Sequence, residues 1–344
     1  MKKSFILSKL AVAIGSGVLL PALALNSCSQ RPSPASSPPS EDALSANPTE
    51  VPMGDRPPQT PLSQTAPAPA SDIQPLRLGV LAIDSALSVH ARYKPLADYL
   101  TEATGYQFEL VSLDQESQFT AVEQGTIDFA TNNSLAAVQV HRLYDTEFLV
   151  THSRPETGVE FSALIVVKDS SSIRTLADLK GKRVACVDFE TAAAGCLFQV
   201  YHLRQAGINP FKDFGEFLEN PSQDSIVLAV LNGSIDAGFI RTGQLEKMMK
   251  TGLLNSTDGL RVLEPMDDDF FYTHTTATYP EWPIAAVKGT DPAVVEAVRQ
   301  ALLNIPPDHP ALTAANVTEF VPAVDYQSID DLIETLQLLS WDAE

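Results

Sequence analysis

The sequence is poor in positive charge, in cysteine and in long apolar runs. Its 344 residues hold 23 Lys and Arg against 43 Asp and Glu, a formal net charge of −20, and only 3 cysteines. The resulting negative field repels nucleic acids and anionic lipid surfaces, so neither is expected as a partner. Beyond residue 74 the longest apolar run, residues 161–167, is far shorter than the ~18 residues that a membrane-spanning helix needs.

Sequence motifs of catalysis are also missing. The 6 histidines show no metal-ligand spacing, and the chain has neither a G-x-S-x-G nucleophile motif nor a glycine-rich phosphate loop. The acidic run at residues 266–269 lacks the spaced oxygen ligands of a calcium loop, and a solvated loop is expected there. We therefore expect no enzyme, no metal and no cofactor.

The first 27 residues have the composition of an export signal. Lysines lie among the first nine positions, residues 10–25 are almost wholly apolar, and no acidic residue occurs. The segment ends in Leu-Asn-Ser-Cys, residues 25–28, which resembles the lipobox at which bacterial lipoproteins are cleaved and lipidated. The prediction is an exported protein, periplasmic or on the cell surface, anchored in a membrane through lipid on Cys28. A plain secretory signal and an uncleaved anchor helix are the alternatives.

Residues 28–74 form a proline-rich segment that cannot build a core. Residues 29–74 hold 11 of the 25 prolines of the chain, separated mainly by Ser, Ala and Thr. An extended tether is expected, with a reach on the order of 140 Å at roughly 3.1 Å per residue in polyproline conformation. The folded part is then residues 75–344.

The folded part alternates short apolar runs with segments of helical period, which indicates an α/β fold. Its length favours two lobes rather than one core. Pro95 is expected to open a helix that ends at Gly105. The expected strands are residues 76–83, 108–113, 127–130, 162–167, 183–187, 235–239, 260–263 and 283–287.

An internal repeat relates the two halves of this region. Residues 121–128, AVEQGTID, recur as AVLNGSID at residues 229–236, an offset of 108. In each copy a helix ends at a glycine, and the strand that follows leads into a polar loop, Thr131–Ser134 or Arg241–Thr242. Strand ends and helix N-termini of parallel sheets bind anions, so two facing lobes with an anion cleft are predicted. A chance recurrence of a common connection is the alternative.

Several longer stretches resemble one protein family. The stretches are residues 165–173, LADLKGK at 176–182, AGINP at 206–210 and 228–236, and they resemble the periplasmic phosphate/phosphite/phosphonate-binding proteins of ABC importers. Residues 240–248, 279–283 and 325–326 are most similar to the branch used as sensory input domains of histidine kinases. The resemblance covers nearly all of residues 76–338.

The resemblance implies the type II periplasmic binding fold, in which two α/β lobes joined by two crossover strands close on a ligand by bending at a hinge. Lobe 1 is predicted to comprise residues 75–166 and 266–344, and lobe 2 residues 167–265. Val166 and the strand after Leu260 are expected near the crossovers.

The sequence departs from the family where phosphonates are bound. Residues 188–195, DFETAAAG, stand where phosphonate binders carry a Ser-Thr-Ser-Gly run, and only Thr191 keeps a hydroxyl. Gln223 stands in place of a histidine, and Glu160 in place of a tyrosine. Backbone N–H groups around residues 192–195 would still hold an anion, with Arg241 as its counter-charge.

The candidate site combines the repeat loops with these family positions. Structural alternatives are an ion pair for Arg241, helix capping for the polar loop residues and packing for Trp282. A neutral or cationic ligand held by carboxylates is the alternative chemistry. The predicted ligand-binding residues are Arg241, Thr242, Asn132, Asn133, Ser134, Thr191, Ala193, Gly195, Glu160, Ser162, Gln223 and Trp282, and the carboxylates of the alternative are Glu160, Glu190 and Glu281.

Cys186 and Cys196 are ten residues apart, so an exported protein either joins them in a disulfide or buries two thiols.

Two functions follow from the sequence. The first is a monomeric solute-binding protein that delivers a small anion to an ABC permease. The second is a sensor that presents its closed form to a kinase or receptor.

Overall fold

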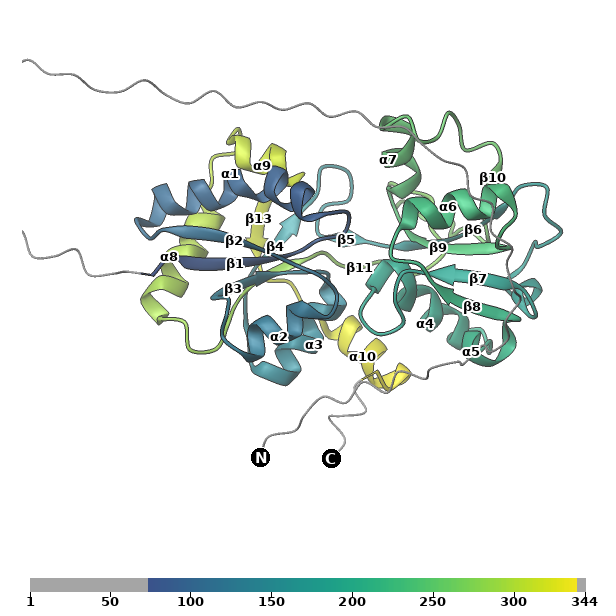
Figure 1. The fold of residues 1–344 in the computed structure, drawn as a ribbon, viewed down its shortest axis with the longest axis horizontal. Coiled ribbons are helices and arrows are strands. Elements are labelled where there is room, and N and C mark those ends of the chain that lie inside the picture. The colour runs from purple at the N-terminus through teal and green to yellow at the C-terminus, as the bar shows by residue number, and fades with distance from the viewer. Residues whose placement is uncertain (1–73, 339–344) are drawn as a thin grey trace, which may run out of the picture. The chain divides into compact units, whose positions relative to one another are not determined.

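The computed structural model describes residues 74–338, and the predicted export signal, Cys28 and most of the proline-rich segment lie outside this range. Two sheets organise the described residues (Figure 1). The strands of the first sheet are β1 (Leu76–Leu81), β2 (Phe108–Leu113), β3 (Phe129–Thr131), β4 (Glu147–Ser153), β12 (Pro283–Ala286) and β13 (Glu319–Pro322). Those of the second are β6 (Ala163–Lys168), β7 (Arg183–Cys186), β8 (Glu216–Glu219), β9 (Ala237–Arg241) and β10 (Leu260–Val262).

The strand orders are β13-β4-β12-β3-β1-β2 and β10-β6-β9-β7-β8. Lobe 1 is the part built on the first sheet, and lobe 2 the part built on the second. The chain passes between them through β5 (Glu160–Phe161) and β11 (Tyr279–Pro280), which pair with each other. The predicted boundary at residues 166 and 167 falls inside β6, all of which pairs within the second sheet.

Helices cover both faces of each sheet (Figure 1). Those of lobe 1 are α1 (Ala86–Thr104), α2 (Ser117–Glu123), α3 (Ser134–Tyr144), α8 (Pro292–Leu303) and α9 (Pro310–Ala315). Those of lobe 2 are α4 (Phe198–Gln205), α5 (Pro210–Asp213), α6 (Gln223–Asn232) and α7 (Gln244–Lys250), with a π-helical turn, η2 (Ala193–Leu197), leading into α4 and a 3₁₀ turn, η1 (Leu176–Leu179), after β6. The last helix, α10 (Gln327–Leu336), packs against α3 and α4.

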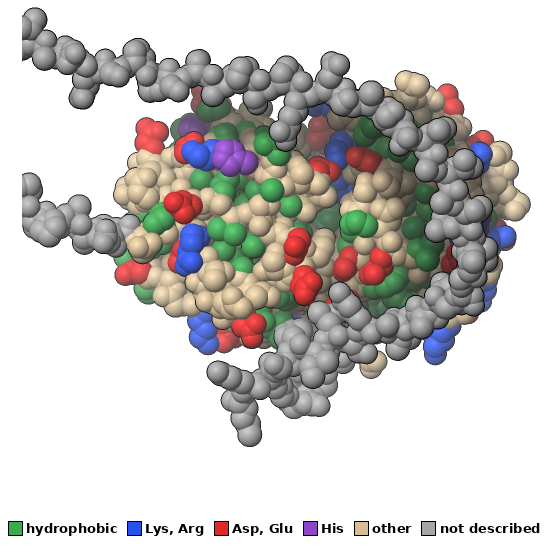
Figure 2. Space-filling view, viewed as in Figure 1, with side chains coloured by type: hydrophobic (Ala, Val, Ile, Leu, Met, Phe, Trp, Pro, Cys, Tyr) green, Lys and Arg blue, Asp and Glu red, His purple; other side chains and the backbone are tan. Residues whose placement is uncertain are grey.

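Separate apolar clusters fill the two faces of each sheet, which is the layering that the alternating pattern predicted. The two-lobed α/β architecture is thereby confirmed. Outside the core, Asp and Glu side chains are spread over the visible face and interspersed with Lys and Arg, in keeping with the acidic composition (Figure 2).

The prediction that Pro95 opens a helix was wrong. Helix α1 begins nine residues earlier at Ala86, where the side chain of Ser85 accepts a hydrogen bond from the Ser88 N–H at 3.1 Å, and Pro95 lies inside it. A proline removes one backbone hydrogen bond. The continuous buried face that includes Tyr93 and Leu96 offsets this loss. Gly105 ends the helix as expected, with a left-handed φ of 78°.

The internal repeat occupies equivalent places in the two lobes. In each copy a glycine follows the helix with positive φ, 62° at Gly125 and 79° at Gly233, a conformation that residues with a side chain rarely adopt. Each copy then leads into a central strand, β3 in the first sheet and β9 in the second. The sequence repeat therefore marks a repeated supersecondary unit.

A matching arginine–aspartate clamp closes each copy. The backbone N–H of Arg77 donates to Asp128 Oδ2 at 2.7 Å, and that of Arg183 donates to Asp236 Oδ2 at 2.9 Å. In both pairs the arginine Nε reaches the same carboxylate oxygen at 3.2 Å. Nη2 of each arginine also donates to the carbonyl of the repeat glycine, at 2.9 and 3.0 Å. These contacts join the amino ends of β1 and β7 to the turns before β3 and β9.

Replacing Asp236 by Asn should destabilise the protein at neutral pH by about 1 kcal/mol, since both groups are partly exposed. The hydrogen bond from the Arg183 side chain lowers the pKa of Asp236. A carboxyl group with a lowered pKa stabilises the fold above its unfolded pKa of about 3.9, and this contribution is lost as the pH falls below that value. Urea unfolding should show the difference from wild type at pH 7 and its shrinkage toward pH 3. The exposed Asp258→Asn variant is the control, and an equal loss in both would contradict the clamp.

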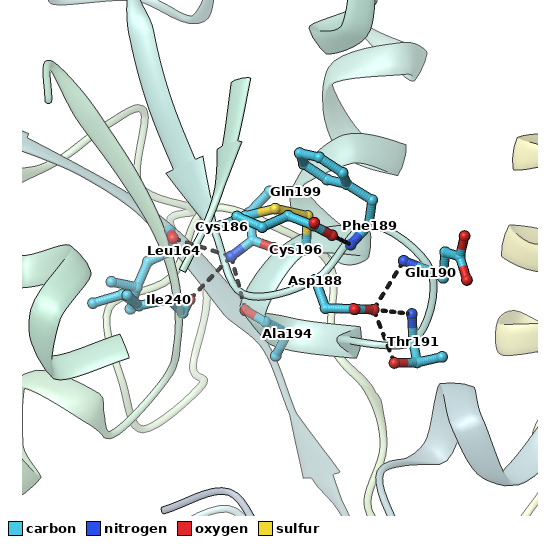
Figure 3. Close-up of a disulfide and its surroundings, with 11 residues drawn as sticks. Leu164, Cys186, Asp188, Phe189, Glu190, Thr191, Ala194, Cys196, Gln199 and Ile240 are labelled. Carbon is cyan, nitrogen blue, oxygen red and sulfur yellow. Dashed lines mark hydrogen bonds between the residues drawn. A yellow bond between two sulfur atoms is a disulfide. The ribbon is translucent and has the colours of Figure 1, made fainter. Parts of the chain in front are cut away.

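A disulfide joins Cys186 at the end of β7 to Cys196 in η2, with an S–S distance of 2.08 Å (Figure 3). The loop that it closes is ordered by Asp188, whose Oδ1 accepts hydrogen bonds from the N–H groups of Glu190 and Thr191 and from the Thr191 hydroxyl at 2.7–3.0 Å. The disulfide and this turn together hold the start of η2 against the end of β7.

Figure 3 also shows how the following helix is attached to the sheet. The buried amide Nε2 of Gln199 lies 2.8, 3.2 and 3.0 Å from the carbonyl oxygens of Ala194, Leu164 and Ile240, which share its two N–H groups. One side chain therefore ties η2 to the strands β6 and β9.

The double variant Cys186→Ala/Cys196→Ala should lower the free energy of unfolding by about 2 to 3 kcal/mol, because the bond closes a loop between cysteines ten residues apart. Urea denaturation with and without dithiothreitol measures the effect. Reductant should lower the midpoint of the wild type and leave that of the double variant unchanged. A wild-type midpoint that is insensitive to reductant, with both thiols shown to be free by alkylation, would contradict the prediction.

Candidate functional site

A cavity of about 900 Å³ lies between the two lobes. Strands β1 and β3 are parallel, and β12 runs antiparallel to both β3 and β4, so the carboxyl ends of β1, β3 and β4 lie at one edge of the first sheet. Residues after these three ends line the cavity from lobe 1. From lobe 2 the lining comes from the segments after the carboxyl ends of β7 and β9. This is the edge at which open α/β sheets bind ligands.

Part of the predicted site lines this cavity. The predicted residues in the lining are Asn133, Ala193, Gly195, Gln223, Arg241, Thr242 and Trp282. They come from both repeat loops, from the start of η2, from α6 and from the segment between β11 and β12. The structure thus brings together positions that lie up to about 150 residues apart in the sequence, although their role in binding stays a prediction.

The other five predicted residues lie outside the lining, and the side chains of three of them have internal hydrogen-bond partners. Asn132 Nδ2 donates to Gln118 Oε1 at 3.0 Å, and the Ser162 hydroxyl lies 3.0 Å from His274 Nδ1. The Thr191 hydroxyl, which also contacts Asp188 Oδ1, lies 2.8 Å from Gln115 Oε1. The remaining two positions are Ser134, which is fully buried, and Glu160, which is exposed in β5.

Arg241 ends β9 and extends along the cavity. Its backbone N–H donates to Gln223 Oε1 at 2.9 Å, and Nη1 donates to the Thr242 carbonyl at 3.3 Å. The buried Nε has no hydrogen-bond partner among residues 74–338. Burial lowers the pKa of Arg241, and the positive charges of Arg92 and Arg154 lower it further. An arginine still stays protonated near neutral pH, so the site holds an incompletely paired cation.

Sequence reasoning missed Arg92 and Arg154, because it searched for cations in the two repeat loops alone. Arg92 lies on α1, which follows β1, and Arg154 directly follows β4. Both line the cavity. The signal that could have identified Arg154 is its place after the apolar run Phe148–Val150 of an unrecognised strand, at the edge where parallel strands end.

Both of these arginines are held by the last turn of α9. Nη2 of Arg92 donates to the Ala315 carbonyl at 3.2 Å, and Nη1 of Arg154 donates to the same oxygen at 3.1 Å and to the Asn316 carbonyl at 3.0 Å. The carbonyls at a helix C-terminus carry partial negative charge, and no N–H group of the helix donates to them. They orient the two guanidinium groups without neutralising them.

We call the part of the lining formed by Arg92, Arg154, Arg241 and Glu281 the cavity floor. Glu281 is the carboxylate of this floor. Its Oε2 lies 3.3 Å from Arg154 Nε, and the two side chains are only 8% and 12% exposed. Burial lowers the pKa of Arg154, but the Glu281 carboxylate and the Tyr93 side chain together more than offset this effect, and the net pKa is raised. Burial and then the positive charges of Arg154 and Arg92 hold the pKa of the neighbouring His152 well below its ordinary value.

The carboxylates of the alternative chemistry are not gathered in the site. Glu281 lines the cavity and is paired with Arg154, whereas Glu160 and Glu190 are exposed and lie outside the lining. Burial, then the nearby Asp188 and Glu219 carboxylates, raise the pKa of Glu190. The described residues therefore offer no cluster of these three carboxylates for a cationic ligand.

Hydrogen bonds and one ion pair link the lobes around the cavity. Lys247 Nζ of lobe 2 lies 2.7 Å from Asp84 Oδ1 of lobe 1. Asn133 Nδ2 of lobe 1 donates to the Thr191 carbonyl of lobe 2 at 3.1 Å. Gln139 Nε2 of lobe 1 likewise donates to the Glu190 carbonyl of lobe 2 at 2.9 Å. The opposing rims of the cavity thus contact each other.

Residues 74–338 contain no helix of the length and apolarity needed to cross a bilayer. Within the same range no group of three or more His, Cys, Asp or Glu side chains is arranged to hold a metal ion.

Solved structures with the same architecture include phosphonate-binding proteins. PhnD1 of Prochlorococcus marinus, solved with methylphosphonate, is 18% identical, with a TM-score of 0.65 over 77% of this chain and 98% of that chain. A protein of Xanthomonas citri bound to ATP is 20% identical, with a TM-score of 0.64 over 76% of this chain and 98% of that chain. These similarities confirm the type II periplasmic binding fold.

A curated relative is the tetrathionate sensor histidine kinase TtrS of Salmonella typhimurium, 29% identical over 234 residues. The match covers 67% of this chain and 39% of the kinase, so the chain spans well under half of the length of that relative. It agrees with the similarity to sensory input domains seen in the sequence.

The sequence model of one family matches residues 78–327, a range that includes both sheets and every cavity-lining arginine. The family is described as the periplasmic substrate-binding protein of phosphonate ABC transporters. Because this match spans most of the chain, the protein belongs to the phosphonate-type periplasmic substrate-binding proteins of ABC transporters.

Proposed function

We propose that the protein is a lipid-anchored, extracytoplasmic solute-binding protein of an ABC-type importer, and that it captures a small oxyanion by closing its two lobes. The observation that carries the proposal is the arginine-lined cavity between the lobes, to which Arg92 and Arg154 come from lobe 1 and Arg241 from lobe 2. A ligand that contacts all three would bridge the lobes. The proposed partner is an ABC permease, and the proposed state is a monomer.

Backbone groups of lobe 2 support an anionic ligand. Residues 192–195 line the cavity at the start of η2, which continues into α4. The first N–H groups of a helix have no helical acceptor and lie at the positive end of its dipole. Arginine adds a planar pair of donors that matches the oxygens of phosphorus and sulfur oxyanions.

The ligand class is best taken as phosphorus or sulfur oxyanions in general. PhnD1 was solved with methylphosphonate, and the kinase relative is named for tetrathionate. The run DFETAAAG keeps one hydroxyl of the phosphonate clamp, on Thr191, which lies outside the cavity lining. Arginines and amides, rather than serine and threonine hydroxyls, would then hold the oxygens.

A sensory role is the second candidate, because the curated relative is a sensor histidine kinase. The same cavity and the same closure would serve both roles. Permease and ATPase genes beside this gene would favour transport, and a two-component pair would favour sensing.

Arg241→Ala should weaken ligand binding roughly tenfold to a hundredfold, because hydrogen bonds to charged groups contribute about 1.5 to 3 kcal/mol. Thermal shift would first screen phosphate, phosphite, methylphosphonate, sulfate, thiosulfate, tetrathionate and small carboxylates, since a ligand at 100 times its Kd stabilises by about 2.7 kcal/mol. Calorimetry then compares the wild type with Arg241→Ala and with the exposed control Lys212→Ala. Small-angle scattering should show a smaller radius of gyration at saturation. Equal affinity of Arg241→Ala and wild type would contradict the proposed site.

The lipid anchor has its own test, because Cys28 lies outside the described residues. Mass spectrometry of membrane-extracted protein should find a mature chain that begins at Cys28 and carries acyl groups. Cys28→Ala should remain unprocessed at that position. A soluble mature chain with an unmodified Cys28, or one cleaved elsewhere, would exclude the anchor.

A further inference from the structure

Two positive side chains converge on one carbonyl oxygen in the cavity floor. Arg92 Nη2 and Arg154 Nη1 both donate to the Ala315 oxygen, at 3.2 and 3.1 Å. Groups that share one acceptor at these distances lie within a few ångströms of each other, where like charges repel. Such a pair needs compensating negative charge.

Glu281 compensates only part of this charge. It pairs with Arg154, which leaves Arg92 and Arg241 without a carboxylate partner within hydrogen-bonding range among residues 74–338. Three guanidinium groups and one carboxylate therefore lie on the cavity floor, an excess of two positive charges, and Asp84 acts on Arg241 more weakly than Glu281 does. Burial is the main cause that lowers the pKa values of Arg241 and His152, and the positive charges of the neighbouring arginines lower both further.

The other acidic groups of the lining have partners of their own or are exposed to solvent. Asp84 is paired with Lys247. Asp188 accepts hydrogen bonds from three donors of its own loop. The remaining lining carboxylates, Asp114, Glu116, Glu156 and Glu246, are exposed to solvent, where their charges are screened.

We propose that the cavity selects a dianion, which binds between Arg92 and Arg154 of lobe 1 and Arg241 of lobe 2. The inference rests on the proposed solute-binding function and adds the charge of the ligand to it. A dianion balances the excess on the floor and cancels the repulsion between arginines on opposite lobes. A monoanion of the same shape leaves one buried positive charge uncompensated, and it closes the lobes less effectively.

Matched pairs of anions separate charge from shape. The probes are sulfate against methanesulfonate, methylphosphonate at pH 8.5 against its monomethyl ester, and ethane-1,2-disulfonate against ethanesulfonate. Calorimetry on the mature chain should give, for at least one pair, a dianion that binds about tenfold or more tightly than its monoanion. Comparable affinities for the two members of every pair that binds would overturn the inference and leave the solute-binding function standing. Failure of all probes would count against the proposed function as well.

Variants that alter the floor charge give a second, independent measurement. Arg92→Gln removes one positive charge without breaking the Glu281 pair, and it should reduce the dianion preference about tenfold. The double variant Arg154→Gln/Glu281→Gln removes one charge of each sign, so the preference should persist even where affinity falls. Lys212→Gln, an exposed change of net charge outside the cavity, should leave both affinities unchanged.

Circular dichroism and thermal unfolding confirm that each variant is folded. Should Arg92→Gln prove unstable, Glu281→Gln serves in its place, because it raises the excess and should strengthen the preference for the dianion. A dianion preference that is unchanged in Arg92→Gln, or lost equally in Lys212→Gln, would contradict the role assigned to the floor.

Discussion

The duplicated arginine–aspartate clamp is the interaction on which the rest of the architecture depends. In each lobe the clamp joins the amino end of one strand to the turn before its neighbour, through Arg77 and Asp128 in the first sheet and Arg183 and Asp236 in the second. It fixes the amino ends of central parallel strands, and strand length then determines where their carboxyl ends lie. Those ends carry the cavity-lining loops of both lobes. A purely structural contact at one edge of each sheet thus positions the residues at the other edge.

The cavity shows how an acidic protein can keep a positive site. At a formal charge of −20 the far field opposes an anion, but screening over about 8 Å at physiological salt leaves the outcome to local groups. Here the local groups include Arg92 and Arg154, which are oriented by carbonyls at the end of α9, and of these two Arg154 is also paired with the Glu281 carboxylate. A helix C-terminus stabilises a cation without cancelling its charge, whereas a carboxylate does cancel it. Positive charge therefore stays available to a ligand.

In the proposed function, division of the arginines between the lobes would couple binding to closure. Arg241 belongs to the second sheet, and Arg92 and Arg154 to the first, so a bridging anion interacts with both lobes only when they are close. A ligand shifts such an equilibrium by its differential affinity for the two states. The contacts between opposing rims, such as Asp84 with Lys247, would add to the closed state. Either proposed role, transport or sensing, would use this coupling, because the permease or the kinase would recognise the closed form.

Sequence by itself determined the α/β class, the two lobes and the repeat, because periodicity, glycine positions and the Asp-containing turns are local properties that survive folding unchanged. It also placed Arg241 and Asn133 at strand ends. It misplaced the start of α1, since the burial of Val89 and Tyr93 outweighed the local preference of Pro95. Arg154 was invisible because polar residues, including the fully buried His152, hid the strand β4 that precedes it. Only the tertiary structure brought Arg92, Arg154 and Glu281 together, because their meeting depends on the order of strands in a sheet and on helix α9, contacts between segments far apart in the chain.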